Sequence, residues 1–371
     1  MKKLNVCVLF GGVSPEHEVS LRSAESVLSV MDPEKYNVIP VGITKGGDWL
    51  LYGSDDWSAL PSGRWQDCPQ NRRAALSPVR GQGLLVFEGP DDAAAEATGD
   101  TSLRGASYVR VPVDVVFPVL HGENGEDGTV QGLFRLAGLP FVGCGVEASA
   151  ASMDKTLTKL IVGLTGVRQA AWEPVTRRDL REPDKVRARI EARFDYPVFV
   201  KPAGTGSSVG VSKVKAPDAL LPALQAALKY DAKVLVEEFI QGKEVEVAVL
   251  GNETPAASVP GEIDSGAEFY DYDAKYLTDT STLYIPARIS EASAEQAREA
   301  AIRVYRALGC RGLSRVDFFV QADGAVVFNE INTMPGFTSI SMYPKLFAAS
   351  GIPYAQLIDR LLRLALEAAD A

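Results

Sequence analysis

Alternating hydrophobic and polar positions near the carboxyl end of the chain predict a β-hairpin with one charged face. Strand-forming residues occupy Val316–Val320 and Ala325–Phe328, and between them lies Asp323-Gly324, a pair favoured in two-residue hairpin turns. Side chains on a strand alternate between its two faces, so the turn determines which residues lie together. Counting outward from it predicts three facing pairs: Asp317–Glu330, Arg315–Asn332 and Phe319–Phe328.

The polar residues of this hairpin predict a site for a metal ion and a phosphate. Facing carboxylates repel each other, so Asp317 and Glu330, with Asn332 diagonal to them, suggest oxygen ligands for a hard divalent cation such as Mg²⁺. Arg315 cannot bind a metal, but it could hold an anion that the same ion binds. The alternative is a solvated cluster of surface charges. The irregular loop at 333–339 favours a site, because binding residues often lie on such loops.

The first part of the chain has the hydrophobic pattern of a βαβ unit. The pattern predicts strand Leu4–Phe10, helix Val19–Met31 and strand Val38–Ile43. The Gly11-Gly12 turn lacks the Gly-x-Gly-x-x-Gly spacing of dinucleotide-binding folds, which disfavours an NAD-dependent oxidoreductase. A further strand, Val113–Leu120, ends at His121 in a Gly-rich loop that caps helix Thr129–Ala137. Open α/β sheets bind ligands at such strand ends, although His121 could equally brace the loop by a hydrogen bond.

The middle of the chain predicts a hairpin flap. Strands at Pro197–Lys201 and Val209–Val214 flank a loop at 202–208 that is rich in Gly and Ser. No Gly-Lys-Ser/Thr follows the glycines and no helix begins there, so the loop is not a P-loop. Its backbone N–H groups could cover phosphates, and a plain Gly-rich turn is the alternative. Strands Val234–Val236 and Val245–Leu250 follow.

Two kinds of element are predicted beyond these strands. The segment Phe269–Tyr276 is too polar for a core strand and too aromatic for a linker, so it predicts a lid. Helices are predicted at Ala294–Leu308 and at Tyr354–Leu366. Ser293 and Gln296 have the spacing of a capping box at the start of the first of these helices.

Length and composition limit the possible functions. A chain of 371 residues is expected to form two or three domains, and residues 53–110 have mixed composition, with an acidic insertion at 89–102 where no chemistry is expected. A net charge of −10 disfavours a nucleic-acid partner, and the apolar run after Met1 is too short for a signal peptide, so no membrane role is indicated. The four cysteines form no CxxC pair, which favours reduced thiols in the cytoplasm, and the two histidines disfavour a zinc site.

Six motifs, which span nearly the whole chain outside residues 53–110, together resemble the D-alanine–D-alanine ligase family. They are Gly11-Gly12-x-Ser14-x-Glu16-x-Glu18-Val19-Ser20, His121-Gly122-x-x-Gly125-Glu126-Asp127-Gly128, Met153-Asp154-Lys155, Lys201-Pro202 through Gly206-Ser207-Ser208-Val209-Gly210, Tyr270-Asp271-Tyr272-x-Ala274-Lys275-Tyr276, and Asn329-Glu330-Ile331-Asn332-Thr333-x-Pro335-Gly336. Each motif alone is weak, but their number and order make the resemblance specific.

The resemblance implies an α/β (α+β) protein with an ATP-grasp fold. Its parts would be an N-terminal Rossmann-like preATP-grasp domain (1–152, with the insertion at about 53–110), a central ATP-grasp subdomain (153–234) and a C-terminal subdomain with the metal platform (235–371). It also implies a cytoplasmic homodimer that uses ATP to join two D-alanine molecules through an acyl phosphate, for peptidoglycan biosynthesis.

The resemblance further implies a role for each residue at a matching position. ATP would contact Lys155, Lys201, Glu237, Glu238, Ile240, Glu244 and Lys275. Two Mg²⁺ or Mn²⁺ ions would be held by Asp317, Glu330 and Asn332. The D-alanine substrates would contact Glu16, His121, Ser341 and Met342. Lid closure and the oxyanion site would involve Glu16, Ser207, Tyr276, Arg315 and Gly336.

Two alternatives stay open at this point. A D-Ala–D-Ser or D-Ala–D-lactate ligase would have the same fold, although the Tyr-x-x-Lys-Tyr pattern at 272–276 favours D-alanine over a hydroxy acid as the second substrate. A regulatory protein that binds a nucleotide without turnover is an alternative of a different class.

Overall fold

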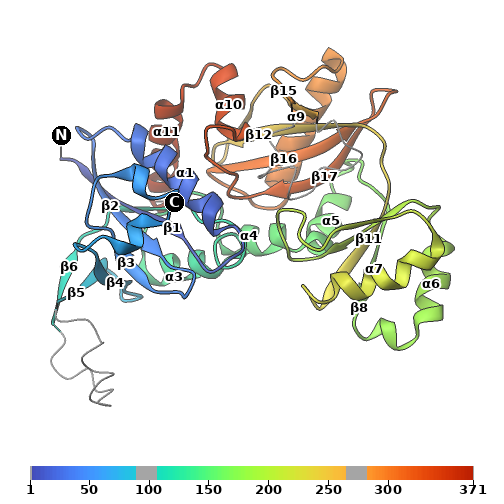
Figure 1. Ribbon diagram of the computed structural model, residues 1–371. Coiled ribbons are helices and arrows are strands. Elements are labelled where there is room, and N and C mark those ends of the chain that lie inside the picture. The colour runs from blue at the N-terminus through green and yellow to red at the C-terminus, as the bar shows by residue number, and fades with distance from the viewer. Residues whose placement is uncertain (1, 89–106, 265–281, 371) are drawn as a thin grey trace.

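The computed structural model describes residues 2–88, 107–264 and 282–370 and contains three β-sheets with helices packed against them (Figure 1). The predicted lid at 269–276, with Lys275 and Tyr276, lies outside the described residues, as does the acidic segment at 89–102. In the ranges that are described, no helix is both long and apolar enough to cross a membrane.

The N-terminal sheet has seven strands and contains the predicted βαβ unit. β1 (Leu4–Gly11) pairs in parallel with β2 (Tyr36–Ile43) and β7 (Val115–Pro118), and α1 (His17–Val30) connects β1 to β2. The sheet continues beyond β2 with antiparallel strands β3 (Trp49–Leu51), β4 (Arg72–Leu76), β5 (Leu84–Glu88) and β6 (Ser107–Val111). The segment predicted as an insertion therefore extends this sheet, and its Trp65 is buried against Phe10.

Three helices lead from this sheet to the central part of the chain. They are α3 (Thr129–Ala137), which has the predicted bounds, α4 (Val146–Met153) and α5 (Lys155–Gly163). The central sheet has the order β10-β9-β11-β8 and consists of β8 (Trp172–Thr176), β9 (Val198–Pro202), β10 (Ser212–Val214) and β11 (Lys233–Glu238). Its helices are α6 (Pro183–Glu191) and α7 (Leu220–Ala227). The predicted boundary at 234/235 falls inside β11, which pairs with β8 and β9.

The C-terminal sheet carries the predicted hairpin. Its strands are β12 (Lys243–Leu250), β13 (Ala256–Ala257), β14 (Gly261–Asp264), β15 (Thr282–Tyr284), β16 (Leu313–Val320) and β17 (Val326–Asn332). α9 (Glu291–Ala307) and α10 (Met342–Ala349) both pack against β12 of this sheet, whereas α11 (Tyr354–Asp370) packs against β7 and α1 of the N-terminal part (Figure 1). Leu357 and Leu361 of α11 share a core with Val6 and Phe117, so the last helices join the first and last parts of the chain.

The hairpin has two of the three predicted pairs, but its turn was predicted wrongly. The backbones of Gln321 and Ala325 pair across a three-residue loop, and Gly324 has a left-handed φ of 86°. This loop shifts the register by one residue, so Phe318 rather than Phe319 faces Phe328. A β-bulge at Asn329 then shifts the register back. The pairs Asp317–Glu330 and Arg315–Asn332 are therefore present as predicted.

The capping prediction for α9 was also wrong. The N-cap is Ser290, whose hydroxyl oxygen accepts a hydrogen bond from the backbone N–H of Ser293 at 3.1 Å. The hydroxyl of Ser293 donates instead to the carbonyl oxygen of Gly324 at 2.9 Å. The helix thus begins earlier than predicted and is tied to the turn of the hairpin.

Candidate active site

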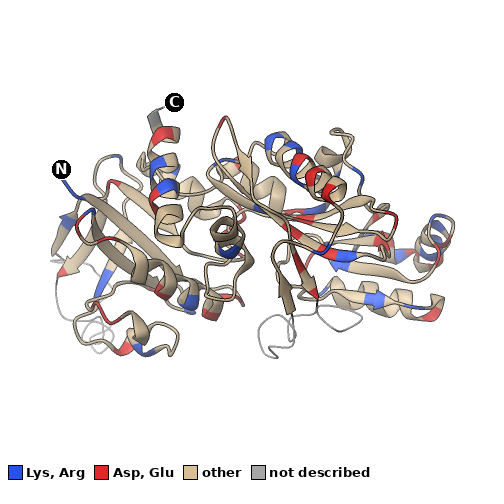
Figure 2. Cartoon of the chain, turned by 90° about the horizontal axis from the view of Figure 1, so that it is seen from above, with Lys and Arg blue, Asp and Glu red and all other residues tan. Residues whose placement is uncertain are grey.

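A cavity of about 470 Å³ lies where the N-terminal sheet, the flap and the C-terminal sheet meet. The predicted site residues in its wall are Glu16, His121, Lys155, Ser207, Arg315, Glu330, Asn332, Gly336, Ser341 and Met342. These residues come from motifs that are far apart in the sequence. Figure 2 shows acidic and basic residues close together on the strands of the C-terminal half of the molecule.

The N-terminal wall is linked directly to the flap. Glu16 is the residue before α1, and its carboxylate accepts a hydrogen bond from the hydroxyl of Ser207. Ser207 has a φ of 50°, a backbone conformation that is uncommon for residues other than glycine and is often found at functional sites. This contact between residues 191 positions apart brings the flap over the cavity.

His121 braces the loops around the cavity, as the second of its two predicted roles would require. It is buried, and its Nδ1 lies 3.0 Å from the carbonyl oxygen of Met334, so Nδ1 must be the donor. Nε2 then accepts from the hydroxyl of Ser23 at 3.1 Å. Burial lowers the pKa of His121 although the nearby Glu16 opposes this shift, so the ring is neutral at pH 7.

Glu126 was quoted in a motif but was not predicted as a site residue. It lines the cavity and accepts hydrogen bonds from the backbone N–H groups of Gly122 at 2.8 Å and Met334 at 3.1 Å. Burial and then the Glu16 carboxylate raise the pKa of Glu126 to about 8, against the effect of these two donors. Its neighbours Glu123 and Asp127 have the same chemistry in the sequence, so the pattern alone could not distinguish the buried acid.

We expect Glu126→Gln to remove part of the pH dependence of folding stability. A carboxyl group with a pKa raised on folding releases its proton first in the unfolded state, so the free energy of unfolding falls as the pH rises from about 4.5 to about 8. The amide does not titrate. Between pH 5 and pH 8 the difference in free energy of unfolding should therefore shift in favour of the variant by about 1 to 3 kcal/mol. Urea denaturation without ligands at both pH values measures this difference. If the free energies of unfolding of the variant and the wild type changed with pH in parallel, the raised pKa assigned to Glu126 would be contradicted.

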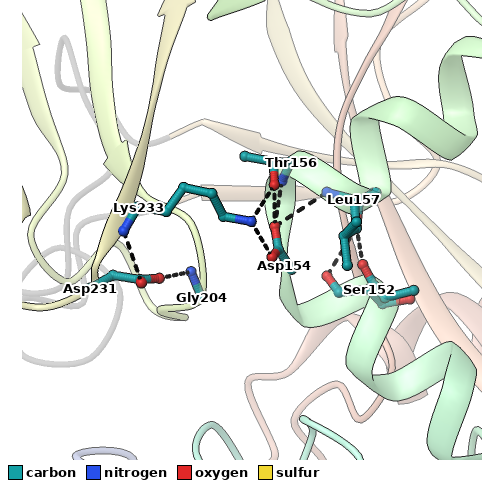
Figure 3. Close-up of polar contacts among 9 residues, drawn as sticks. Ser152, Asp154, Thr156, Leu157, Gly204, Asp231 and Lys233 are labelled. Carbon is teal, nitrogen blue, oxygen red and sulfur yellow. Dashed lines mark hydrogen bonds and ion pairs between the residues drawn. The ribbon is translucent and has the colours of Figure 1, made fainter. Parts of the chain in front are cut away.

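The junction between α4 and α5 anchors the lysine side of the site (Figure 3). Asp154 caps α5, and its carboxylate accepts from the backbone N–H groups of Thr156 at 2.9 Å and Leu157 at 3.2 Å. Lys233 of β11 forms an ion pair with Asp154 and donates to the hydroxyl of Thr156 at 2.6 Å. The helix that begins with Lys155 is therefore fixed to the central sheet.

The first residues of the flap are held from two sides. Asp231 accepts a hydrogen bond from the backbone N–H of Gly204 at 2.7 Å, which Figure 3 shows beside Lys233. Lys155 donates from its ammonium group to the carbonyl oxygen of Thr205 at 2.6 Å. Lys155 thus lies under the flap, where an anion in the cavity could replace this carbonyl oxygen as its partner.

We expect Asp231→Ala to loosen the flap without changing the chemistry. Losing the Gly204 contact should cost about 1 kcal/mol of flap order. This corresponds to a rise of about fivefold in KM for the ATP that the family resemblance implies, with kcat within about twofold. Steady-state kinetics and amide hydrogen exchange at 203–208 measure the two effects. Asp195→Ala, an exposed acid on the same part of the chain, is the matched control. Unchanged exchange at the flap would contradict the role of Asp231.

The residues predicted around adenine lie beside the cavity, at the junction of the central and C-terminal sheets. The buried carboxylate of Glu237 lies between the ammonium groups of Lys159, at 2.5 Å, and Lys201, at 2.6 Å. Burial alone would raise the pKa of Glu237, but the two lysines outweigh it and lower the pKa to about 2. Lys159 was not predicted, since a lysine in a helix usually faces solvent.

The other three residues of the predicted adenine and ribose set differ in what they contact. Glu238 accepts from the backbone N–H of Ala171 at 2.7 Å, so its carboxylate braces the start of β8. Ile240 is buried in a small apolar cluster with Val327. Glu244 lies on β12, opposite Phe319 of β16. None of these three side chains belongs to the cavity wall that the described residues form.

The acidic platform contains one acid more than predicted. Glu246 of β12 pairs in register with Asp317, which in turn faces Glu330, so three carboxylates follow one another across three strands. Arg315 donates to both oxygens of Asp317, at 2.8 and 2.7 Å, and its Nε lies 3.1 Å from Glu246. Burial would lower the pKa of Arg315, but these carboxylates outweigh it and raise it. Asn332 also donates to Asp317, at 3.1 Å.

The donor chemistry of this platform fits a hard divalent cation. In the parts of the chain that are described, no group of three or more His, Cys, Asp and Glu side chains is arranged to hold a metal ion by itself. Mg²⁺ usually binds one or two carboxylates and completes its coordination with waters and phosphate oxygens. Glu330 and Asn332 line the cavity, whereas Asp317 lies outside the described wall, and its oxygens accept hydrogen bonds from Arg315 and Asn332.

The opposite end of the cavity is formed by the loop between β17 and α10. A side chain at Gly336 would clash with Ser341, since a Cβ there would lie 2.8 Å from its hydroxyl oxygen. That hydroxyl accepts from the backbone N–H of Thr338 at 3.0 Å. Ser341 is the residue before α10, and Met342 begins the helix with its side chain buried. Ser341 and Met342 both line the cavity, so the start of this helix borders it, and a helix N-terminus favours a negative charge nearby.

Three α/β parts around a cavity, with Lys155 under a Gly-rich flap on one side and an acid and arginine platform on the other, define the ATP-grasp class. The family model for the D-Ala D-Ala ligase N-terminus matches residues 5–144 of the sequence. The family model for the D-Ala D-Ala ligase C-terminus matches residues 161–363. The chain belongs to the D-alanine–D-alanine ligase family.

Individual relatives agree with this assignment over their full length. The chain is 48% identical to the D-alanine–D-alanine ligase of Caldicellulosiruptor bescii, covering 99% of this chain and 96% of that protein. It is 50% identical to that of Acetivibrio thermocellus, covering 98% and 96%. Among solved structures, it is similar to the VanG D-Ala:D-Ser ligase of Enterococcus faecalis (TM-score 0.86, 38% identity, 98% and 100% covered). It is also similar to the D-alanine–D-alanine ligase of Coxiella burnetii (TM-score 0.83, 34% identity, 100% and 96% covered).

Proposed function

We propose that this chain uses ATP to join two D-alanine molecules into D-alanyl-D-alanine through an acyl phosphate, for peptidoglycan synthesis. The observation that carries the proposal is the single cavity that joins Glu16, Arg315 and the start of α10. An anionic side chain, a cationic side chain and helix N–H groups at separate points of one cavity suit two amino acids placed end to end. Full-length similarity to proteins named D-alanine–D-alanine ligase supports the same substrates.

In this mechanism the first D-alanine binds with its ammonium group at Glu16. Its carboxylate attacks the γ-phosphorus of ATP, which gives ADP and an acyl phosphate. The amine of the second D-alanine, after losing a proton, attacks the carbonyl carbon, and the tetrahedral intermediate breaks its C–O bond to release phosphate. Arg315 and the N–H of Gly336 stabilise the oxyanion, where such contacts act mainly in the transition state.

The remaining residues bind and orient the substrates. Lys155 and Lys201 hold the phosphates of ATP, while Glu237, Glu238, Ile240 and Glu244 surround its adenine and ribose. Ser341 and the start of α10 hold the carboxylate of the second D-alanine, which the helix N-terminus favours electrostatically. The Ser207 contact to Glu16 closes the flap over the first substrate and excludes water.

Asp317, Glu330 and Asn332 would hold two Mg²⁺ or Mn²⁺ ions, whose chemistry is to neutralise the charge of the phosphates. We further infer a homodimer, as the family resemblance implies, and a cytoplasmic location. The free cysteines, three of which are buried, support a reducing compartment. Size-exclusion chromatography with light scattering tests the homodimer.

Product analysis tests the proposed function and its alternatives. The chain is incubated with ATP, Mg²⁺ and an equal mixture of D-alanine, D-serine and D-lactate, and the products are identified by mass spectrometry. D-alanyl-D-alanine is expected as the main product, with release of one phosphate per dipeptide. A main product with D-serine or D-lactate would contradict the proposed second substrate, and tight ATP binding without turnover would favour the regulatory protein.

A further inference from the structure

Lys159 is a buried lysine that the proposed mechanism does not use. It follows Lys155 by four residues on α5, so both side chains leave the same face of the helix. Its side chain is only 3% exposed, and its ammonium group lies 2.5 Å from Oε1 of Glu237. Burying an ammonium group costs free energy unless a partner compensates for the lost hydration. The burial of Lys159 therefore requires a physical explanation.

Lys159, Glu237 and Lys201 form a cluster with more positive than negative charge. Lys201 approaches the other carboxylate oxygen of Glu237, Oε2, at 2.6 Å. Two ammonium groups therefore share one carboxylate, so these three side chains together carry a net charge of +1. The Glu238 carboxylate also attracts Lys159 electrostatically, but it accepts its hydrogen bond from the backbone N–H of Ala171. Lys201 also lies 3.3 Å from the side-chain oxygen of Asn329, the bulge residue of β17, but this amide is neutral. A partly buried cluster with an excess positive charge favours an anion as a further partner.

The two lysines differ in their freedom to meet such an anion. Lys201 has a side chain that is 15% exposed and lies at the end of β9, directly before the flap. Lys159 is buried between α5 and β11, so its side chain is held in place by packing. A nucleotide that enters the site can therefore attract Lys201, while Lys159 stays at Glu237.

We propose that Lys159 is a positioning residue for nucleotide binding: it keeps Glu237 paired, so that Lys201 can exchange Glu237 for the phosphates of ATP. The inference rests on the proposed function, which assigns phosphate binding to Lys201 and adenine binding to Glu237. Without Lys159, Glu237 would depend on Lys201 alone, and phosphate would have to compete with a buried carboxylate for the same ammonium group.

Comparing ATP with adenosine tests this exchange, because adenosine has no phosphate and needs no contact with Lys201. We expect Lys159→Met to raise the Kd for ATP about tenfold or more and the Kd for adenosine by less than about threefold. Calorimetric titration of the full chain without D-alanine gives the first value, and displacement by adenosine gives the second. Lys159→Gln, which keeps a hydrogen-bond donor but no charge, gives the same comparison with a polar group at the buried position.

A double variant and a matched control separate this role from a merely structural one. Lys159→Met with Glu237→Gln restores the net charge of +1 and removes the competing carboxylate, so the ratio of the two Kd values should return to within about threefold of the wild type. Val162→Ala creates a small cavity at a buried position one turn along the same helix and changes no charge. It should leave the ratio unchanged at a comparable loss of thermal stability.

The outcomes that overturn the inference are distinct from those that overturn the proposed function. Equal losses of ATP and adenosine affinity in Lys159→Met, or a double variant that keeps the altered ratio, would contradict the exchange of Lys201. Wild-type protein that does not bind ATP would contradict the proposed function itself, and the inference with it.

Discussion

Arg315→Met is expected to lower kcat by about 100-fold or more, with the affinity for ATP within about threefold of the wild type. Arg315 lines the cavity and is held by Asp317 and Glu246, so its position does not depend on the nucleotide. A contact to an oxyanion becomes strong only when negative charge develops, and its loss therefore affects turnover more than binding. Steady-state kinetics and calorimetric titration measure the two quantities.

The loss of Arg315 also leaves two carboxylates, Asp317 and Glu246, without their common partner, so the activity must be referred to the folded fraction. Thermal melts give this fraction at the assay temperature. Arg288→Met is the matched control, because Arg288 pairs with Glu262 at 2.6 Å and Asp264 at 2.9 Å on the same sheet, away from the cavity. Near-normal turnover in Arg315→Met would contradict the assigned role.

Asp317→Asn is expected to reduce kcat/KM at least about 100-fold while lowering the stability of the ligand-free protein by about 1 to 3 kcal/mol. Two facing carboxylates alone would repel, and the substitution would then stabilise the protein. The two hydrogen bonds from Arg315 to Asp317 reverse that sign, because an asparagine oxygen can accept only one of them well. Urea denaturation without ligands measures the stability change.

Metal binding by Asp317 is tested separately by melts with and without Mg²⁺ and ADP. The ligand-dependent rise in Tm should be much smaller in Asp317→Asn than in the wild type. Asp323→Asn is the control on the same hairpin, since Asp323 lies in the exposed turn and accepts from the N–H of Ala325 at 3.0 Å. A rise in Tm that persists undiminished in Asp317→Asn would place the metal elsewhere.

The hairpin illustrates what hydrophobic alternation can and cannot predict. The facing pairs Asp317–Glu330 and Arg315–Asn332 were predicted correctly from a two-residue turn that the structure does not have. A longer turn and a bulge shift the register in opposite directions, and their effects cancel at the platform. The bulge lies where the N–H of Phe328 donates to the carbonyl oxygen of Arg168, a contact across 160 positions of the chain. No local pattern around Asn329 contains that information.

The residues missed at the site share the same cause. Lys159, Glu126 and Glu246 are ionisable residues whose partners are distant in the sequence, respectively Glu237, the N–H of Met334 and Arg315. Helices and strands show burial through periodic apolar residues, so a buried charge inside a polar stretch has no such signal. Residues inside named motifs, such as Glu16 and Ser207, were placed at the site because the family resemblance covered them.

The packing of α11 against the N-terminal sheet could not be predicted from the sequence either. Its amphipathic pattern predicted a helix but did not say which sheet its apolar face covers. The domain boundaries predicted at 152/153 and 234/235 follow the motifs, whereas β11 crosses the second of them and α10 and α11 join the first and last parts.

An isotope experiment tests the central claim most directly, since it follows the oxygen that an acyl phosphate must transfer. The chain is incubated with ATP, Mg²⁺ and D-alanine labelled with ¹⁸O in both carboxylate oxygens, and the phosphate and dipeptide are examined by mass spectrometry. The account predicts that each phosphate released carries one ¹⁸O and is matched by one D-alanyl-D-alanine. Unlabelled phosphate would mean that water rather than the D-alanine carboxylate attacks ATP. Labelled phosphate without dipeptide would mean that water rather than the second amine takes the acyl group, and either result would contradict the account.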